Sequence, residues 1–460
     1  MIAVSNGRPI AVMDATWLRM DRPENLMVIE SVMWFDTPVD WDRLAGVVRR
    51  RMVARYPVFR QHPVDSRIPL VQPRWEDDPD FRLERHIVRA RLADPGDEAA
   101  LERYVEAQMN RPFQHNHPLW EMHFLDGFGS GSALVVRLHH ALADGMALSQ
   151  VLLSLTDAGS TGDLRDRPPA ENLPVASFPL TGTIGGLASG GYRLLSTAGN
   201  LATPGGLREA LATADGAARA GGKILLHRNP PSPLRGTPGP RKLAAWSAPR
   251  RLTDVNRIGR LADATVNDVL VAAVSGAIHG YLLDHGAPPV DLATMVPVNL
   301  RPAGEDLPRE LGNRFALVLL PLPTGVHSPL LRLEQTKRRM DAIKHTPEAV
   351  LTFGLLAAIG RTHPEVERRL IDFFTAKAIG VTTNVIGPRR RRYLAGSPIA
   401  GVLSWVPGSG SQTLNVAIFS YDRKVRVGFK ADARVVPDVA KIVHAFDAEM
   451  DQLTRIARAA

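Results

Sequence analysis

The first 160 residues alternate between helical and strand-like spacing of apolar positions. A helix over 41–56 is predicted by apolar residues three and four positions apart: Trp41, Leu44, Val47, Val48 and Met52. A second helix, over 146–155, has Leu148, Val151, Leu152 and Leu155 on one face. The segment SALVVRLHH, residues 132–140, reads as a strand. This part of the chain is therefore expected to mix strands and helices.

The pattern changes between residues 158 and 240, where Gly, Pro, Ser and Ala dominate in runs such as GTIGGLASGG and RNPPSPLRGTPGP. Only weak helices are expected there, near 184–198 and 206–226. A connection of this length between compact halves is unusual unless it crosses over or has a function of its own.

Regular structure is predicted to resume near Leu243. Thr265 and Asp268 have the spacing of a capping box, and the helix after them is apolar over a wide face as far as Tyr281, so it should be buried between layers. Strands are expected at 293–298, 314–322, 414–420 and 424–430, the last two joined by a short hairpin at Asp422-Arg423. No internal repeat of fixed period is found.

Composition restricts the class of protein. A chain of 460 residues with 45% hydrophobic and 22% charged residues has the profile of a soluble two-domain protein. Neither a run of 18 apolar residues nor a basic-then-apolar leader is present, so cytoplasmic residence is expected. The absence of cysteine excludes disulfides, thiolate metal sites and a cysteine nucleophile.

The net charge of +9, with a pI near 10.1, has two equally weighted explanations. It indicates either an anionic partner, such as a membrane surface or a phosphate-bearing cofactor, or simply an arginine-rich composition. Basic runs interleaved with aromatic residues do not occur, so a nucleic-acid partner is not expected.

The segment HHALADG, residues 139–145, lies where a predicted strand ends and a predicted helix begins. His140 there could act as a general base on an alcohol, which is a poor nucleophile until its proton is removed. A histidine pair at a strand end is more often structural than catalytic, and both interpretations stay open from the motif alone. Asp144 suits a helix cap or an ion pair better than acid–base chemistry, and Gly145 gives the backbone freedom at the bend. A metal site is not expected, because no HxxxH or HExxH pattern supplies further ligands.

Competing chemistries leave no trace in the sequence. There is no GxSxG elbow and no GxGxxG loop, and Gly221-Gly222-Lys223 misses the phosphate-loop spacing by one residue. A serine hydrolase, a dinucleotide-binding protein and a nucleotide hydrolase are therefore unsupported.

A series of motifs in order resembles one family. After PIAVMDATWLRM (residues 9–20) come HPLWEMHFLDG and the HHxxxDG segment, followed by TVNDVLVAAVSGAI, MVPVNLRPAGE, LGNRFALVLLPLP, TTNVIGP (382–388) and LNVAIFSYDRKVRVGFKADARVVPD. HHxxxDG alone resembles the coenzyme A-dependent acyltransferase superfamily, which includes chloramphenicol acetyltransferase and condensation domains. The ordered set resembles, more specifically, the bacterial wax ester synthase/diacylglycerol acyltransferase family, over nearly the whole chain except residues 158–240.

The resemblance implies an α/β fold of two chloramphenicol-acetyltransferase-like domains, each with a mixed sheet and flanking helices, that meet at a tunnel. On this basis we expect an N-terminal half at 1–160, a crossover at 161–240 and a C-terminal half at 241–460. It also implies transfer of a fatty acyl group from acyl-CoA to diacylglycerol or a long-chain alcohol, directly and without an acyl-enzyme. His140 would be the base and His139 a supporting residue. No permanently bound cofactor is implied, only acyl-CoA as a co-substrate.

Other site residues follow from the same motifs. Trp120, Asn267, Asp268, Asn384 and Asn415 are predicted to contact substrate, although packing roles for Trp120 and for the Asn267-Asp268 pair are weighed beside this. The donor to the oxyanion is left open among four asparagines and the amides near Gly145: Asn267, Asn299, Asn384 and Asn415. Arg137 and Arg301 are the candidate partners of Asp144.

Three positions depart from the family pattern: Thr383, Ile386 and Arg423. The first two leave the substrate preference open. Residues 184–226 and the run Arg389–Arg392 are candidates for contact with an inner-membrane or lipid-droplet surface, while a solvated loop or a coenzyme A phosphate site would also explain the arginines.

Two other functions remain as alternatives at this stage. One is a condensation or offloading enzyme that takes its acyl group from a carrier protein. The other is a non-catalytic lipid-binding relative, which the intact His140 and Asp144 argue against.

Overall fold

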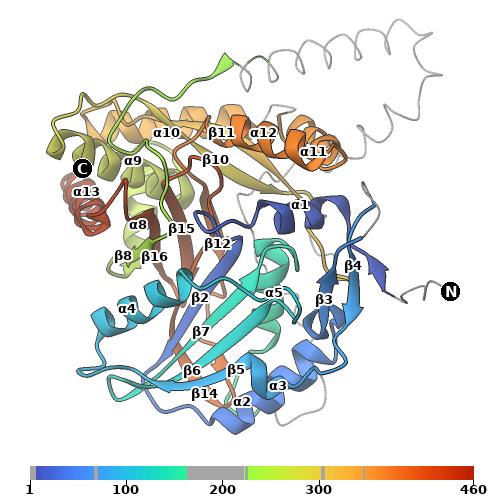
Figure 1. The fold of residues 1–460 in the computed structure, drawn as a ribbon. Coiled ribbons are helices and arrows are strands. Elements are labelled where there is room, and N and C mark those ends of the chain that lie inside the picture. The colour runs from blue at the N-terminus through green and yellow to red at the C-terminus, as the bar shows by residue number, and fades with distance from the viewer. Residues whose placement is uncertain (1–6, 67–70, 163–221, 223–225, 302–305, 345–347) are drawn as a thin grey trace, which may run out of the picture.

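The computed structural model describes residues 7–66, 71–162, 222, 226–301, 306–344 and 348–460 (Figure 1). The weak helices expected near 184–198 and 206–226 lie almost wholly outside the described residues. Within the described residues the chain forms two α/β halves, and this confirms the expected class of mixed sheets with flanking helices.

The N-terminal half is built on a six-stranded mixed sheet whose centre is formed by β2 and β7. Only β5 and β6 pair in parallel, and all other neighbours are antiparallel. In spatial order the strands are β13 (Tyr393–Leu394), β14 (Ser397–Trp405), β2 (Val28–Phe35), β7 (Gly131–His139), β6 (Trp120–Phe128) and β5 (Ile87–Arg91). Because β2 and β7 are buried along their whole length, both faces of the sheet centre are covered.

Helices and a small sheet complete this half. The helices are α1 (Val12–Met20), α2 (Trp41–Val48) with a π-helical extension (Arg49–Val53), a 3₁₀ turn (Pro57–Arg60), α3 (Leu83–His86), α4 (Glu98–Met109) and α5 (Gly145–Ser154). The small sheet has the order β1 (Arg8–Pro9), β4 (Arg74–Asp77), β3 (Gln61–Val64). The helices predicted over 41–56 and 146–155 and the strand predicted over 132–140 are confirmed to within a few residues.

The C-terminal half contains a second mixed sheet and a long two-stranded ribbon. The sheet runs β12 (Thr382–Ile386), β15 (Leu414–Tyr421), β16 (Lys424–Asp432) and β8 (Lys242–Trp246), with β9 (Arg250–Arg251) also paired to β16. The ribbon, β10 (Leu292–Asn299) and β11 (Phe315–Leu322), continues from this sheet through a parallel bridge between Met295 and Val381. The four strands predicted in this half are all present.

Among the described residues, six helices complete this half: three of them pack on α9, and the other two, α11 and α12, pack on each other, with α11 also against β11 (Figure 1). They are α8 (Leu252–Arg260), α9 (Val266–Asp284), α10 (Pro329–Lys344), α11 (Glu348–Ile359), α12 (Pro364–Thr375) and α13 (Val439–Ala459). The predicted capping box is present, since the Thr265 side chain accepts from the Asp268 amide and the Asp268 carboxylate accepts from the Thr265 amide. By length and composition α9 could cross a membrane, but 83% of its apolar window is buried inside this half, as in the core helix of a soluble protein.

The two halves exchange structure. Strand β14 comes from the C-terminal part of the chain but pairs with β2 in the N-terminal sheet, with Ser404 opposite Ser31. The hydrophobic core of the N-terminal half accordingly includes Leu403 and Trp405. The domain boundaries expected at residues 160 and 240 remain a prediction. The two halves are not spatially independent, because β14 crosses from one to the other.

Candidate active site

An apolar cavity, called the tunnel below, lies between the halves and contains about 1690 Å³ of atom-free space, part of it open to solvent. Its wall comes from α1, β2 and α5 of the N-terminal half, and from β10, β11, α11, α12 and β12 of the C-terminal half, with β14 between them. Apolar side chains make up most of that wall, and leucine, methionine and valine are the commonest of them. Such a cavity suits a long hydrocarbon chain.

His140 lies in the wall of this tunnel, directly after β7. Its backbone amide donates to the Met27 carbonyl (2.7 Å), and its ring stacks on Trp17 of α1 with 4.1 Å between ring centroids. Phe315 of β11 approaches the same ring at 5.7 Å. Burial lowers the pKa of His140 to about 4, against the opposing field of Asp144. The imidazole is therefore neutral near pH 7, which is the state that a general base needs.

The Nδ1 atom of His140 is buried and has no hydrogen-bond partner among the described residues. A general-base role for this ring would therefore fall to the opposite nitrogen, Nε2.

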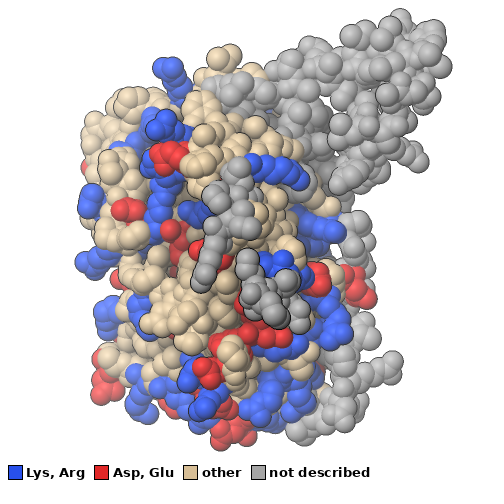
Figure 2. All heavy atoms as spheres, turned by 45° about the vertical axis from the view of Figure 1, so that its right-hand side comes forward, with Lys and Arg blue, Asp and Glu red and all other residues tan. Residues whose placement is uncertain are grey.

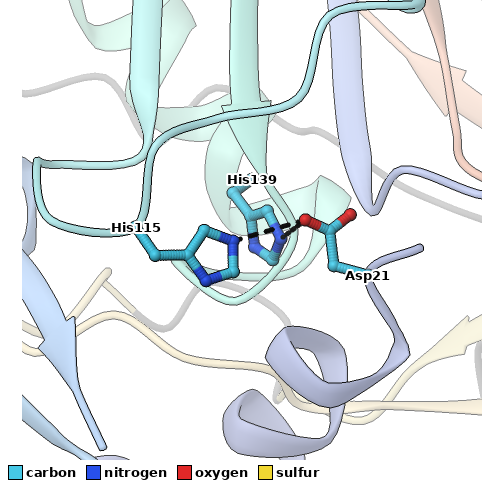
Figure 3. Close-up of side chains that lie close together, drawn as sticks. All are labelled: Asp21, His115 and His139. Carbon is cyan, nitrogen blue, oxygen red and sulfur yellow. Dashed lines mark hydrogen bonds and ion pairs between the residues drawn. The ribbon is translucent and has the colours of Figure 1, made fainter. Parts of the chain in front are cut away.

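His139 is not part of the tunnel wall; its ring points toward Asp21, and His115 approaches the same carboxylate (Figure 3). His139 Nε2 lies 3.6 Å and His115 Nε2 3.3 Å from Asp21 Oδ2, and the Met27 amide donates to Asp21 Oδ1. Burial opposes the ionised form of Asp21, but the two imidazoles outweigh it and hold the pKa of this carboxyl well below its usual range. Burial also lowers the pKa of His139.

Asp21, His115 and His139 are close enough together to be tested as a metal site, with their ligand atoms all within 4.8 Å of one another. His139 Nδ1, however, accepts a hydrogen bond from the Ala141 amide (3.1 Å). The neutral ring then carries its proton on Nε2, the atom that faces Asp21, so no lone pair is offered there. The donor set suits a carboxylate that receives N–H groups better than a metal ion.

Asp144 connects the motif to the other half of the molecule. Its Oδ1 caps α5 by accepting from the Ala147 amide (2.9 Å). Its Oδ2 accepts from the Arg301 guanidinium and from the Arg314 amide (2.9 Å). Of the two candidate partners, Arg301 is the one in contact, whereas Arg137 pairs with Glu121. The position of Asp144 is that of a structural residue.

Gly145, the first residue of α5, lines the tunnel. Its φ lies outside the left-handed region, so the expected backbone freedom is not what this position requires. A Cβ added there would meet no atom within 4 Å. The glycine therefore leaves space in the tunnel beside the histidine.

The predicted substrate contacts lie mostly elsewhere. Trp120 is fully buried in the N-terminal core, where it stacks on His86 and donates to the Phe59 carbonyl (2.8 Å). It does not line the tunnel, and its packing role prevails because the side chain is fully buried and its N–H already has a protein acceptor. Asp268 serves the capping box of α9, away from the tunnel wall.

Of the four asparagines considered as oxyanion donors, most lie outside the tunnel wall. Asn384 donates to Asn267 (2.9 Å) on the face of β12 opposite Thr383 and Val385, which do line the tunnel. Asn415 accepts from the Val381 amide (2.9 Å) and lines a separate, smaller cavity. Asn299 alone of the four is part of the tunnel wall.

The arginine run 389–392 is not one basic patch. Arg392 is buried and donates to the Thr156 hydroxyl (3.1 Å) and carbonyl (3.0 Å), and Arg391 pairs with Asp422. Arg389 and Arg390 are exposed. On the face drawn in Figure 2, Lys and Arg side chains are interspersed with Asp and Glu rather than gathered in one stripe.

Four residues that contact or support His140 were not singled out from the sequence: Asp14, Trp17, Asn313 and Phe315. Asp14 and Trp17 lie within the motif PIAVMDATWLRM and Asn313 and Phe315 within LGNRFALVLLPLP, so the motifs marked the right segments without indicating which side chains face the histidine.

Comparison with known proteins covers almost the whole chain. Residues 10–270 match the wax ester synthase/diacylglycerol acyltransferase catalytic domain, and residues 311–454 match the WS/DGAT C-terminal domain. The "Probable diacylglycerol O-acyltransferase tgs1" of Mycobacterium tuberculosis is 28% identical over 420 residues, 87% of this chain and 84% of that protein. Another diacylglycerol O-acyltransferase by name from that species, Rv3087, is 30% identical over 423 residues, 88% of this chain and 87% of that protein.

Solved structures share the fold. The wax ester synthase/diacylglycerol acyltransferase of Marinobacter aquaeolei VT8 superposes with a TM-score of 0.69 at 21% identity, over 98% of this chain and 99% of that one. The first condensation domain of the calcium-dependent antibiotic synthetase, in complex with a substrate analogue, gives a TM-score of 0.62 at 16% identity, over 98% and 97% of the two chains.

Proposed function

The chain belongs to the wax ester synthase/diacylglycerol acyltransferase family, and from that premise we propose how it transfers an acyl group to diacylglycerol or a long-chain alcohol. His140 is the general base, and acyl-CoA is the donor. The observation that carries this proposal is the position of a neutral, buried histidine in the wall of an apolar tunnel between the halves.

Transfer proceeds in one ternary complex. His140 Nε2 removes the hydroxyl proton of the acceptor as its oxygen attacks the thioester carbonyl. The tetrahedral intermediate collapses, the carbon–sulfur bond breaks, and the thiolate of coenzyme A takes the proton from His140. No acyl-enzyme forms in this scheme, and the absence of cysteine and of a GxSxG serine motif agrees with direct transfer.

Asn299 is the best-placed candidate donor to the oxyanion. It lies in the tunnel wall on β10, opposite Phe315 of β11, and Phe315 packs on the His140 ring. Its Oδ1 accepts from the Arg301 amide (3.0 Å), which leaves its Nδ2 group to donate. For Asn299→Ala we expect kcat to fall about 100-fold with a smaller change in KM, as for the loss of one oxyanion donor.

The acyl chain lies along the apolar wall, which includes Leu148, Leu152, Leu317 and Leu319. Thr383, one of the departures from the family pattern, is part of that wall. It therefore belongs to the residues that determine which chains fit.

Contact with a lipid surface would deliver the acceptor. Leu355 of α11 is exposed and also lines the tunnel, so the tunnel meets solvent there. Val366 and Phe373 on the neighbouring helix α12 are exposed apolar side chains, and this supports peripheral docking on a membrane or lipid droplet through α11 and α12.

Docking is tested by sedimentation with phosphatidylglycerol vesicles. We expect the double variant Val366→Glu/Phe373→Glu to bind less than the wild type, and Leu283→Glu, an exposed site on α9, to bind normally. Equal binding by all three proteins would contradict docking through α12.

The function is tested with labelled palmitoyl-CoA and a panel of alcohols and diacylglycerols, with the ester products resolved. His140→Ala should form no product and keep the circular dichroism spectrum of the wild type, and near-normal turnover would overturn the assignment of the base. Competition between palmitoyl-CoA and a palmitoylated carrier protein separates this function from the condensation alternative, which requires the carrier-bound donor.

A further inference from the structure

Helix α1 presents two side chains to the region of His140, although it is far from the HHxxxDG motif in sequence. Trp17 stacks on the imidazole, and Asp14, one turn earlier, is almost completely buried. Asp14 Oδ1 accepts two hydrogen bonds from Asn313, one from its backbone amide (2.9 Å) and one from its Nδ2 (2.8 Å). These hydrogen bonds satisfy the buried carboxylate and connect α1 to the segment that contains Asn313.

The side-chain amide of Asn313 is a bridge. Its Nδ2 group has two hydrogens, and besides Asp14 it reaches the backbone carbonyl of His140 at 2.9 Å. If the amide were turned over, its Oδ1 would face Asp14 Oδ1 and the His140 carbonyl oxygen, which are both acceptors. The orientation with Nδ2 toward these two oxygens is therefore the correct one. Since the His140 amide donates to Met27, both backbone polar groups of the histidine are fixed.

The bridge joins the two halves. Asn313 precedes β11 of the C-terminal half, and Asp14 and His140 belong to the N-terminal half. The next residue, Arg314, donates its amide to Asp144. Two carboxylates of one half thus hold residues 313 and 314 of the other beside the base.

We propose that Asp14 and Asn313 are positioning residues of the reaction: Asp14 orients the Asn313 amide, and that amide fixes the backbone of His140 so that its ring meets the acceptor hydroxyl at the correct angle. The proposal rests on the role of His140 given above. Neither side chain needs to touch a substrate for this role, because a small displacement of a catalytic group is enough to slow the reaction.

The bridge also makes transfer sensitive to mild acid. Burial raises the pKa of Asp14 to about 6, although the hydrogen bonds from Asn313 and the charge of Arg8 oppose this and Asp144 adds to it. Two charged groups act on Asp14: Arg8, which pairs with Glu310, and Asp144, which pairs with Arg301. His140 is connected to it through Asn313. Below about pH 6 Asp14 takes up a proton and becomes a weaker acceptor, so the bridge loosens and kcat falls while His140 is still neutral.

The test compares Asp14→Asn and Asn313→Ser with the wild type, as the pH dependence of kcat and KM between pH 5 and 8. The wild type should show a step in kcat near pH 6. Both variants should lack the step, with kcat reduced roughly 10- to 100-fold at pH 7.5 and KM for palmitoyl-CoA unchanged. The double variant should be no slower than the slower single variant, because both substitutions break one bridge.

Asn229→Ser is the matched control. Asn229 is likewise buried and accepts from a backbone amide, that of Ala293 (2.7 Å), but it does not contact His140. This variant should lose stability and keep both kcat and the step. If Asp14→Asn fails to fold, Asn313→Ser decides, since it retains Asp14 and the backbone hydrogen bond to it.

Three results would overturn the proposal: a wild-type profile without a step near pH 6, single variants that keep both the step and wild-type kcat, or single effects that multiply in the double variant. His140→Ala separates these failures from failure of the proposed function. If His140→Ala is inactive and the bridge variants behave as the wild type, only the positioning role is wrong.

Discussion

At the scale of single residues, the burial of His140 has a thermodynamic consequence apart from catalysis. An ordinary histidine in the unfolded chain takes up a proton near pH 6.5, whereas burial lowers the pKa of His140 in the folded protein to about 4. Between these values the unfolded state binds the extra proton, so the contribution of this residue to stability is complete above pH 6.5 and is lost as the pH falls toward 4.

We therefore predict that acid weakens the wild type more than His140→Gln. Between pH 7.5 and pH 5, the wild type should lose about 2 kcal/mol more in the free energy of unfolding than this variant, which has no ionisable group at the site. Urea unfolding at the two pH values measures the difference. Equal losses in both proteins would mean that the imidazole is more accessible to water than its position indicates.

The residue scale also shows where sequence reasoning reached its limit. That Asp144 is a cap and an ion-pair partner was predicted, because capping is a local property of the strand-to-helix junction. The Asn313 bridge was not, since Asn313 and the His140 carbonyl are 173 residues apart and nothing local marks the contact. For Trp120, the residue type favoured a core role over substrate contact without excluding either, and the three-dimensional packing decides for the core.

At the scale of elements, the hairpin between β15 and β16 illustrates a local conflict. Both turn residues, Asp422 and Arg423, have positive φ values, 47° and 61°. Positive φ at both central residues gives a turn whose twist matches that of the two strands, and such turns favour Asn or Gly. Most other side chains are strained there, because the Cβ atom comes too close to the backbone. The sequence predicted the hairpin because the flanking alternation is strong, even though Arg423 is a poor residue for the turn.

Arg423→Gly should consequently stabilise the protein. Relief of the left-handed strain exceeds the entropy that glycine loses on folding, and we expect a net gain of about 0.5–1 kcal/mol. The melting temperature and the urea midpoint both report it. Asp422→Gly serves as a comparison with a smaller gain, because aspartate tolerates positive φ better than arginine. A loss of stability in Arg423→Gly would show that the arginine side chain makes a compensating contact.

Strand β14 shows the opposite situation, because neither the strand nor its partner was predicted from the sequence. Its apolar pattern fits a buried strand, but pattern alone does not say which sheet receives it. Only the structure shows that it leaves the C-terminal half to pair with β2. The tunnel depends on this exchange, because Ser404 of β14 and Ser31 of β2 both belong to its wall.

At the scale of the whole molecule, buried polar contacts hold the two halves in register around the tunnel. Lys430 of β16 donates to Glu30 of β2 at 2.9 Å, and both side chains are almost fully buried. Burial raises the pKa of Glu30, and the charge of Lys430 opposes this. Each side chain is the buried partner of the other, and loss of Lys430 would leave Glu30 in the interior without a compensating charge.

Lys430→Met should for this reason destabilise the protein by about 3–5 kcal/mol at pH 7.5. The loss should shrink at pH 5.5, because an unpaired Glu30 is easier to bury once it has taken up a proton. The double variant Glu30→Gln/Lys430→Met should recover most of the stability, since no unpaired charge remains. Lys441→Met, which removes a solvent-exposed partner of Asp438, is the matched control and should change stability by less than about 1 kcal/mol. If the double variant is no more stable than Lys430→Met, the pair acts through geometry between the halves rather than through compensation of charge.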